Sequence, residues 1–212
     1  MKNLTEIVFI LDESGSMAGM EKDVIGGFNS FIKKQMKEDC DTIISTVLFN
    51  NSYKLIHDRV DINKIDELTE KDYCPCGSTA LLDAVGITIR NIQIIQDHSR
   101  RIDIPDKTIF VITTDGMENS SREYTYSCVK ALIKESEQIR NWHFMFLADN
   151  LDAAQYAENL GIRRNMAANY DVSKDTRHAF NALYRCCNII RDDDSDRVTL
   201  SDLMEDERNK DE

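Results

Sequence analysis

The apolar run from Ile7 to Leu11 constrains the fold of this chain more than any other segment. It reads IVFIL, is rich in β-branched residues and contains no polar position. A strand with one face in solvent alternates apolar and polar residues, whereas a continuous apolar run is typical of a strand covered on both faces. The run therefore predicts a buried strand in a parallel sheet that has helices on both sides.

The rest of the chain alternates between strand-like and helix-like segments. Apolar or alternating runs predict further strands at residues 42–49, 53–60, 108–113, 142–148 and 166–170. Apolar residues at helical spacing predict helices at residues 19–37, 80–95, 124–139, 151–160 and 174–190. This alternation indicates an α/β fold, a doubly wound and mostly parallel six-stranded sheet with helices on both faces.

One strand of this sheet is expected to run against the others. Asn50, Asn51 and Ser52 form a short turn sequence between the second and third strands. Parallel neighbours need a long crossover connection, whereas a short turn joins antiparallel neighbours. The third strand is therefore predicted to be an antiparallel edge strand.

Composition divides the chain near residue 190. The chain has 212 residues, 42% of them apolar, which suits one globular domain, expected here at residues 1–190. Residues 191–212 contain ten acidic and four basic residues, so they carry half of the net charge of -12. Because this stretch is poor in apolar residues, we expect it to be an acidic, disordered tail.

Charge and cysteine content exclude several classes of function. A net charge of -12 repels phosphate backbones and argues against a nucleic-acid partner. The sequence shows no secretory-signal pattern and no apolar run near the roughly 20 residues that span a bilayer, so no membrane partner is expected. The six cysteines are then interpreted as reduced thiols of a cytoplasmic protein.

Oxygen-bearing side chains follow the first predicted strand at alternate positions. They are Asp12, Ser14 and Ser16, one carboxylate and two hydroxyls that can converge on one point. Such donors select hard cations such as Mg²⁺, Mn²⁺ or Ca²⁺. A local interpretation is equally supported by these residues alone: a serine caps the next helix and Asp12 ends the strand.

Two other segments place oxygen donors at predicted element ends. Thr79 lies in the sequence GSTALLDA, at residues 77–84, just before a strong helix, and Asp115 follows the strand at residues 108–113. Each has a simpler local interpretation. Thr79 would be a helix N-cap with Asp83 as a favourable acidic group in the first turn, and Asp115 with Gly116 would form a strand-end turn.

Together the three segments resemble the metal-ion-dependent adhesion site of the von Willebrand factor A domain family. The motif positions are Asp12, Ser14 and Ser16 as Asp-x-Ser-x-Ser, then Thr79, then Asp115 in Thr-Asp-Gly. The resemblance covers roughly residues 5–190 and is strongest to stand-alone bacterial members. It implies a cation, Mg²⁺ or else Mn²⁺ or Ca²⁺, at the top of the sheet. The three hydroxyls would bind it, and the two aspartates would act directly or through water.

The resemblance also implies a binding function rather than catalysis. An open position on the cation would accept a carboxylate from a partner protein, and no small-molecule substrate is expected. The alternative is a Mg²⁺-dependent phosphatase or phosphotransferase with Asp12 as its nucleophile. That chemistry needs a second acid two residues later, where this chain has Ser14. Neither a Gly-x-Ser-x-Gly motif nor a phosphate-binding loop is present.

The sequence Cys74-Pro75-Cys76 precedes the Thr79 segment. A zinc site would need about four ligands, and a redox pair is usually spaced as Cys-x-x-Cys. We therefore interpret these residues as two ordinary thiols in a loop that proline stiffens. Cys186 and Cys187 are expected to pack in the core from the last helix.

Overall fold

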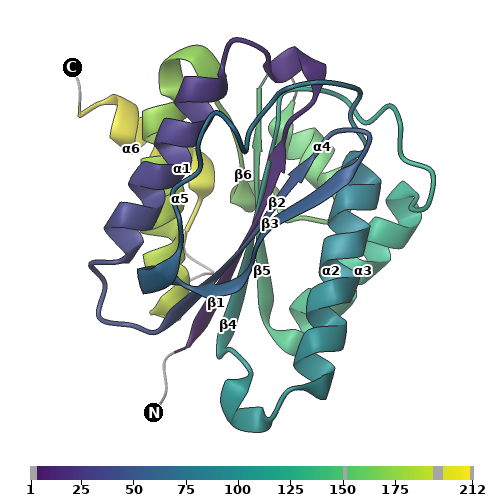
Figure 1. Cartoon of the computed structure of the whole chain (residues 1–212), viewed down its shortest axis with the longest axis vertical. Coiled ribbons are helices and arrows are strands. Elements are labelled where there is room, and N and C mark those ends of the chain that lie inside the picture. The colour runs from purple at the N-terminus through teal and green to yellow at the C-terminus, as the bar shows by residue number, and fades with distance from the viewer. Residues whose placement is uncertain (1–3, 150–151, 193–197, 211–212) are drawn as a thin grey trace.

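The computed structural model describes residues 4–149, 152–192 and 198–210. Its centre is a six-stranded sheet in the order β3-β2-β1-β4-β5-β6, with helices on both faces (Figure 1). The predicted fold class is therefore confirmed. The strands are β1 (Thr5–Asp12), β2 (Thr42–Phe49), β3 (Tyr53–Asp61), β4 (Lys107–Thr114), β5 (Trp142–Ala148) and β6 (Ala167–Asn169).

Strand β1 occupies the middle of the sheet. It pairs in parallel with β2 on one side and with β4 on the other, and every one of its residues is buried. Cover on both faces explains why its sequence lacks an apolar–polar alternation. Strand β3 pairs antiparallel with β2 and forms the edge, as its short connection predicts.

The helices form two layers. On one face lie α1 (Glu21–Gln35), α5 (Val172–Arg191) and α6 (Leu200–Arg208), and on the other lie α2 (Leu81–His98), α3 (Tyr126–Arg140) and α4 (Ala153–Leu160) (Figure 1). None of these described helices is long and apolar enough to cross a membrane.

A glycine lets two of these helices touch. A Cβ atom added at Gly27 of α1 would lie 2.4 Å from a ring carbon of Phe180 in α5. No real side chain tolerates such a distance, so the glycine that weakens α1 as an isolated helix permits its close packing on α5.

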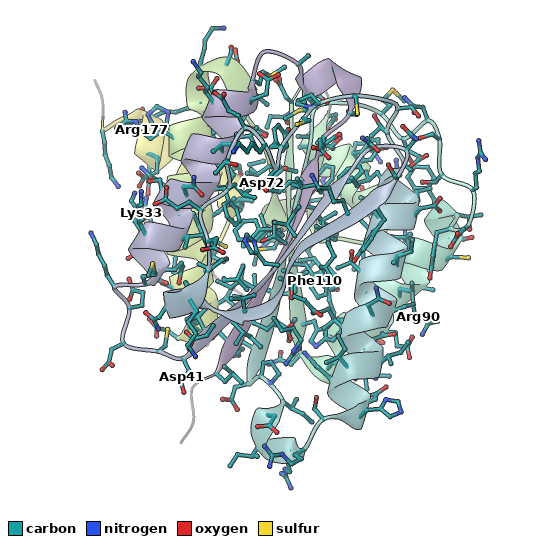
Figure 2. The ribbon with its side chains drawn as sticks, in the orientation of Figure 1. Lys33, Asp41, Asp72, Arg90, Phe110 and Arg177 are labelled. Atoms are coloured by element: carbon teal, nitrogen blue, oxygen red, sulfur yellow. The ribbon has the colours of Figure 1, made fainter. Side chains whose placement is uncertain are left out.

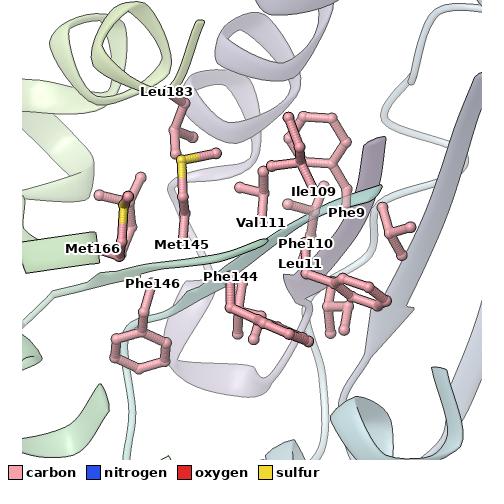
Figure 3. Packing of buried hydrophobic residues seen from close by; sticks show 14 of the residues in the cluster. Phe9, Leu11, Ile109, Phe110, Val111, Phe144, Met145, Phe146, Met166 and Leu183 are labelled. Carbon is pink, nitrogen blue, oxygen red and sulfur yellow. The ribbon is translucent and has the colours of Figure 1, made fainter. Parts of the chain in front are cut away.

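Aromatic side chains fill the core on both faces of the sheet. Phe9 of β1 packs edge-on against Phe28 and Phe31 of α1, with ring centroids 5.1 and 5.0 Å apart. Phe110 and Phe144 stack with centroids 4.7 Å apart (Figure 3). Charged side chains such as Lys33 and Arg90 instead project outward (Figure 2). Full burial of each of these phenylalanine rings stabilises the fold by about 1.5–3 kcal/mol. The packed core therefore holds the strands, and with them the strand ends, in a fixed arrangement.

The end of the chain differs from the expected disordered tail. Within residues 191–212, the described residues 198–210 contain α6, which docks on α5, whereas 193–197 and 211–212 lie outside the described residues. Arg208 of α6 pairs with Asp175 of α5 at 2.6 Å. Apolar residues are few here, but helical spacing places them on one face, so that prediction is wrong for this part. The buried residues are Val198, Leu200, Leu203 and Met204.

Candidate metal centre

Asp12 ends β1 with a fully buried carboxylate. Its Oδ1 accepts a hydrogen bond from the backbone amide of Ser14 at 2.7 Å, and its Oδ2 accepts one from the hydroxyl of Thr114 at 2.6 Å. Burial raises the pKa of Asp12, the hydrogen bonds offset part of this rise, and the nearby Asp115 adds to it. The carboxylate is thus held in a low-dielectric position by neutral donors.

Three oxygens lie in a chain beside Asp12. The hydroxyls of Ser14 and Ser16 are 3.1 Å apart, and Ser16 donates to Oδ1 of Asp115 at 2.7 Å. In an octahedral shell with ligands at about 2.1 Å, neighbouring oxygens lie about 3 Å apart. The observed spacing therefore fits adjacent positions around one small cation.

Thr79 reaches the same place from the segment before α2. It is buried, and a Cβ atom added at Gly116 would lie 3.5 Å from the Thr79 hydroxyl and 3.6 Å from the Ser16 hydroxyl. Both hydroxyls therefore lie next to the same glycine. All five residues of the motif thus come together at the carboxyl ends of β1 and β4, and Ser16 is the exposed member.

The helix-capping interpretations are wrong. The N-cap of α1 is Met20, and the side chain of Ser14 makes no capping hydrogen bond to the short 3-10 helix at Gly15–Met17. The N-cap of α2 is Ala80, not Thr79. Glu118 caps α2 instead, because its Oε2 accepts from the amide of Leu82 at 2.9 Å. The serine and threonine hydroxyls are therefore not used as caps.

Asp83 lies in the first turn of α2, as expected, and it also has a tertiary role. Its carboxylate accepts hydrogen bonds from three consecutive backbone amides, those of Arg122, Glu123 and Tyr124, at 2.7–2.9 Å. It thereby anchors the loop that leads from Asp115 to α3.

Two positioning residues were not identified from the sequence. Thr114 holds Asp12, as described above, and Asn119 holds Thr79 with two bonds. Asn119 Oδ1 accepts a hydrogen bond from the backbone amide of Thr79 at 2.9 Å, and the backbone amide of Asn119 donates one to the carbonyl of Thr79 at 3.0 Å. The position of Thr114 just before Asp115 was an available signal, whereas nothing local links Asn119 to Thr79.

Residues 73–79, called the strap from here on, lie along the Asp12–Ser16 loop. Gly77 of the strap has a φ of +74°, and a Cβ atom there would lie 2.0 Å from Oδ1 of Asn51, so any other residue would be strained at this position. Four hydrogen bonds join strap and loop. They run from Tyr73 Oη to Asp12 O, from Cys74 N to Glu13 Oε1 (2.5 Å), from Cys76 N to Glu13 O (2.9 Å) and from Gly15 N to Gly77 O (3.1 Å).

The donor set indicates the kind of ion that it would hold. Within the described ranges, no group of three or more His, Cys, Asp or Glu side chains is placed to hold a metal. The candidate set instead has two carboxylates and three hydroxyls, which are hard donors suited to Mg²⁺, Mn²⁺ or Ca²⁺. Burial and the nearby charge of Asp149 raise the pKa of Asp115. A bound cation would favour the charged forms of both acids, so the residues fit a divalent ion.

No protein-family model matches this chain, and no curated protein matches its sequence. Solved structures do match. The vWF domain of the type V pili tip protein Mfa5 from Porphyromonas gingivalis is 14% identical, with a TM-score of 0.60, over 89% of this chain and 96% of that one. The manganese-loaded TRAP protein of Plasmodium vivax is 17% identical, with a TM-score of 0.60, over 86% of this chain and 73% of that one.

A third match is longer than this chain. Proximal thread matrix protein 1 of the mussel byssus is 13% identical with a TM-score of 0.57, and the match covers 87% of this chain but 46% of that protein. This chain therefore spans about half of that relative. Identities this low establish the fold alone, which is that of von Willebrand factor A domains.

Proposed function

We propose that this von Willebrand factor A fold is a protein–protein interaction module that binds its partner through a divalent cation. Asp12, Ser14, Ser16, Thr79 and Asp115 would hold the ion, which is Mg²⁺ or else Mn²⁺ or Ca²⁺. One observation carries the proposal. Two carboxylates and three hydroxyls from three distant segments converge at one edge of the sheet, and the Ser14–Ser16 and Ser16–Asp115 oxygen spacings of 3.1 and 2.7 Å suit a single coordination shell.

The five candidate ligands differ in charge and in exposure. Asp12 and Asp115 supply two buried negative charges, and the three hydroxyls add none. Ser16 is exposed, so a partner approaches from its side. When bound, the cation supplies the positive charge that attracts a carboxylate of the partner. A chain with a net charge of -12 would in this way bind an acidic side chain.

The neighbouring structures support a binding role. One is the domain of a pili tip protein, and another is manganese-loaded. The geometry of Asp12 argues against the phosphatase alternative. Its carboxylate is fully buried and both of its oxygens accept hydrogen bonds, whereas a nucleophile must reach its substrate. We therefore favour an interaction module over an enzyme.

The cysteines support a cytoplasmic location. All six are free thiols in this structure, including the neighbouring exposed Cys74 and Cys76. Compartments that oxidise thiols favour disulfides, whereas the cytoplasm keeps thiols reduced.

Titration calorimetry with Mn²⁺ and Mg²⁺ tests the ion site directly. The wild type should bind one ion, and Asp12→Ala should bind none while keeping the circular dichroism spectrum of the wild type. The matched control is Glu6→Gln, which alters a fully buried acid at the opposite end of the same strand. Equal ion binding by the wild type and Asp12→Ala would refute the site.

Partner capture tests the second half of the proposal. The immobilised chain is incubated with cell extract in Mn²⁺ and then washed with a chelator. We expect a specific protein to elute with the chelator from the wild type but not from Ser16→Ala. Capture that is indifferent to the chelator would contradict metal-dependent binding.

A further inference from the structure

The strap carries two exposed thiols separated by one residue. Cys74 and Cys76 are both free and both exposed, on either side of Pro75. Of the other four cysteines, Cys186 and Cys187 are buried, Cys40 is half-buried, and the exposed Cys128 lies at the start of α3. Cys74 and Cys76 are thus the two exposed thiols that adjoin each other along the chain.

In this structure the two thiols contact different neighbours. The Cys74 thiol donates to the carbonyl of Glu70 at 3.4 Å, whereas the Cys76 sulfur accepts from the side-chain amide of Asn50 at 3.3 Å. These hydrogen bonds to sulfur are weak, so the strap can give up either one at little cost. Along the chain, Pro75 alone separates the two thiols.

Chain geometry shows what a bond between them would require. Two residue steps span at most about 7 Å when fully extended. A disulfide needs Cα atoms about 4.4–6.8 Å apart. The pair is therefore always near bonding range, but the strap must bend and move its sulfur atoms together. Because the two cysteines are so close along the chain, formation of a disulfide between them would change the backbone conformation of the strap.

We propose that Cys74 and Cys76 are a thiol-modification site that a low-molecular-weight disulfide converts to an intrachain disulfide. One thiolate attacks the small disulfide, forms a mixed disulfide and releases one small thiol. The second thiolate then attacks the protein sulfur of that mixed disulfide and releases the other small thiol. The two cysteines lose two electrons and two protons, and the small disulfide gains both to become two thiols.

Closure of this bond would reach the candidate metal site through hydrogen bonds to Glu13 and along the strap itself. The amides of Cys74 and Cys76 both bond to Glu13, which lies between Asp12 and Ser14, and the strap ends at Thr79. Bending the strap therefore strains the bonds that hold both segments. The effect on the ion rests on the proposed function, whereas the effect on the backbone does not.

The test compares the reduced full-length protein with protein treated with glutathione disulfide. Peptide mapping by mass spectrometry should find residues 74–76 lighter by two hydrogens. Amide hydrogen exchange at residues 13–16 should become faster, and the affinity for Mn²⁺ should fall at least about fivefold, a typical coupling between sites. Dithiothreitol should reverse all three changes.

Cysteine variants test whether the Cys74–Cys76 pair causes these changes. Cys76→Ser should form only a mixed disulfide at Cys74 and keep the slow exchange of residues 13–16. Cys128→Ser is the matched control, because it removes an exposed thiol outside the strap, and it should respond like the wild type.

Two results would overturn the proposal. One is modification of Cys128 while residues 74–76 stay reduced. The other is a closed disulfide with unchanged exchange at residues 13–16. A reduced protein that binds no Mn²⁺ would refute the proposed function instead. The mass and exchange measurements would still test whether the Cys74–Cys76 disulfide forms and alters the backbone.

Discussion

Strand β1 carries a fully buried acid near each end, and the two acids have different charged and hydrogen-bonding neighbours. Burial is the largest cause that raises the pKa of both Glu6 and Asp12. Glu6 Oε2 accepts from the guanidinium of Arg59 at 2.5 Å and from Gln96 at 2.9 Å. Asp12 instead accepts hydrogen bonds from neutral groups of Thr114 and Ser14, and its charged neighbour is another acid, Asp115.

This difference separates a structural ion pair from a candidate functional site. A buried charge is costly unless it is paired. At the amino end the fold supplies the cation itself, since Arg59 adopts a left-handed φ of +50° beside a register shift between β2 and β3. At the carboxyl end, the cation of the proposed function would come from solution and offset the negative charge. The following four experiments test this contrast.

The largest effect is expected from Arg59→Leu. This change removes the cation and leaves Glu6 buried and unpaired, which should lower the free energy of unfolding by about 3 kcal/mol at neutral pH. Urea unfolding measures it, with the exposed Arg90→Leu as control, for which we expect less than about 0.5 kcal/mol. A loss as small as that of the control would show that the ion pair does not stabilise the fold.

Asp12→Asn should have the next largest effect, on ion affinity rather than on folding. It keeps the size of the side chain but removes its charge, so the Kd for Mn²⁺ should rise at least about 100-fold, the upper end of what loss of a supporting residue costs. Calorimetry measures this change. Glu6→Gln should bind Mn²⁺ like the wild type, and a parallel loss in both variants would erase the contrast between the two ends of β1.

A smaller effect is expected from Thr114→Val. This substitution removes the hydroxyl that donates to Asp12 Oδ2, so the carboxylate is held less firmly and Mn²⁺ affinity should fall about 10-fold. The neighbouring Thr113→Val also removes a buried hydroxyl and serves as control. If both variants lose affinity equally, Thr114 has no specific positioning role.

The smallest effect concerns pH in the presence of a chelator. The pKa of Asp12 in the folded protein is above its ordinary value of 3.8, so the folded state binds this proton more tightly than the unfolded state. The resulting stabilisation is present below pH 3.8 and is lost as pH rises through the higher folded pKa. Asp12→Asn should therefore gain thermal stability relative to the wild type as pH increases.

Thermal melting curves of both proteins at several pH values measure that difference. Subtracting the melting temperature of one protein from that of the other removes the contribution of the other acids, which both proteins share. Excess Mn²⁺ should restore the wild type at neutral pH but not the variant. A stability difference that shrinks as pH rises would contradict the raised pKa of Asp12.

Much of the architecture was predictable because it depends on local patterns. The continuous apolar run of β1, the short connection before β3 and the helical spacing in α2 report burial and geometry within a few residues. The motif also identified five candidate ligands, since their spacing after strands and before a helix is itself a local feature.

Other features depend on contacts between distant residues and were not predictable. Asn119 lies 40 positions from Thr79, and Arg59 lies 53 positions from Glu6. Helix α6 was mistaken for a disordered tail because its few apolar residues matter only once α5 offers a surface to receive them.

The sequence by itself determined that this is a mostly parallel α/β sheet with hydroxyls and carboxylates at its strand ends, because side-chain periodicity follows directly from strand and helix geometry. Only the tertiary structure decided that Ser16 meets Asp115 and Thr114 meets Asp12 at hydrogen-bonding distance. It also decided that helix capping does not use the candidate hydroxyls and that a strap with two thiols lies beside them. Each of these facts depends on the register of neighbouring strands and on loops that meet in space, which no local pattern encodes.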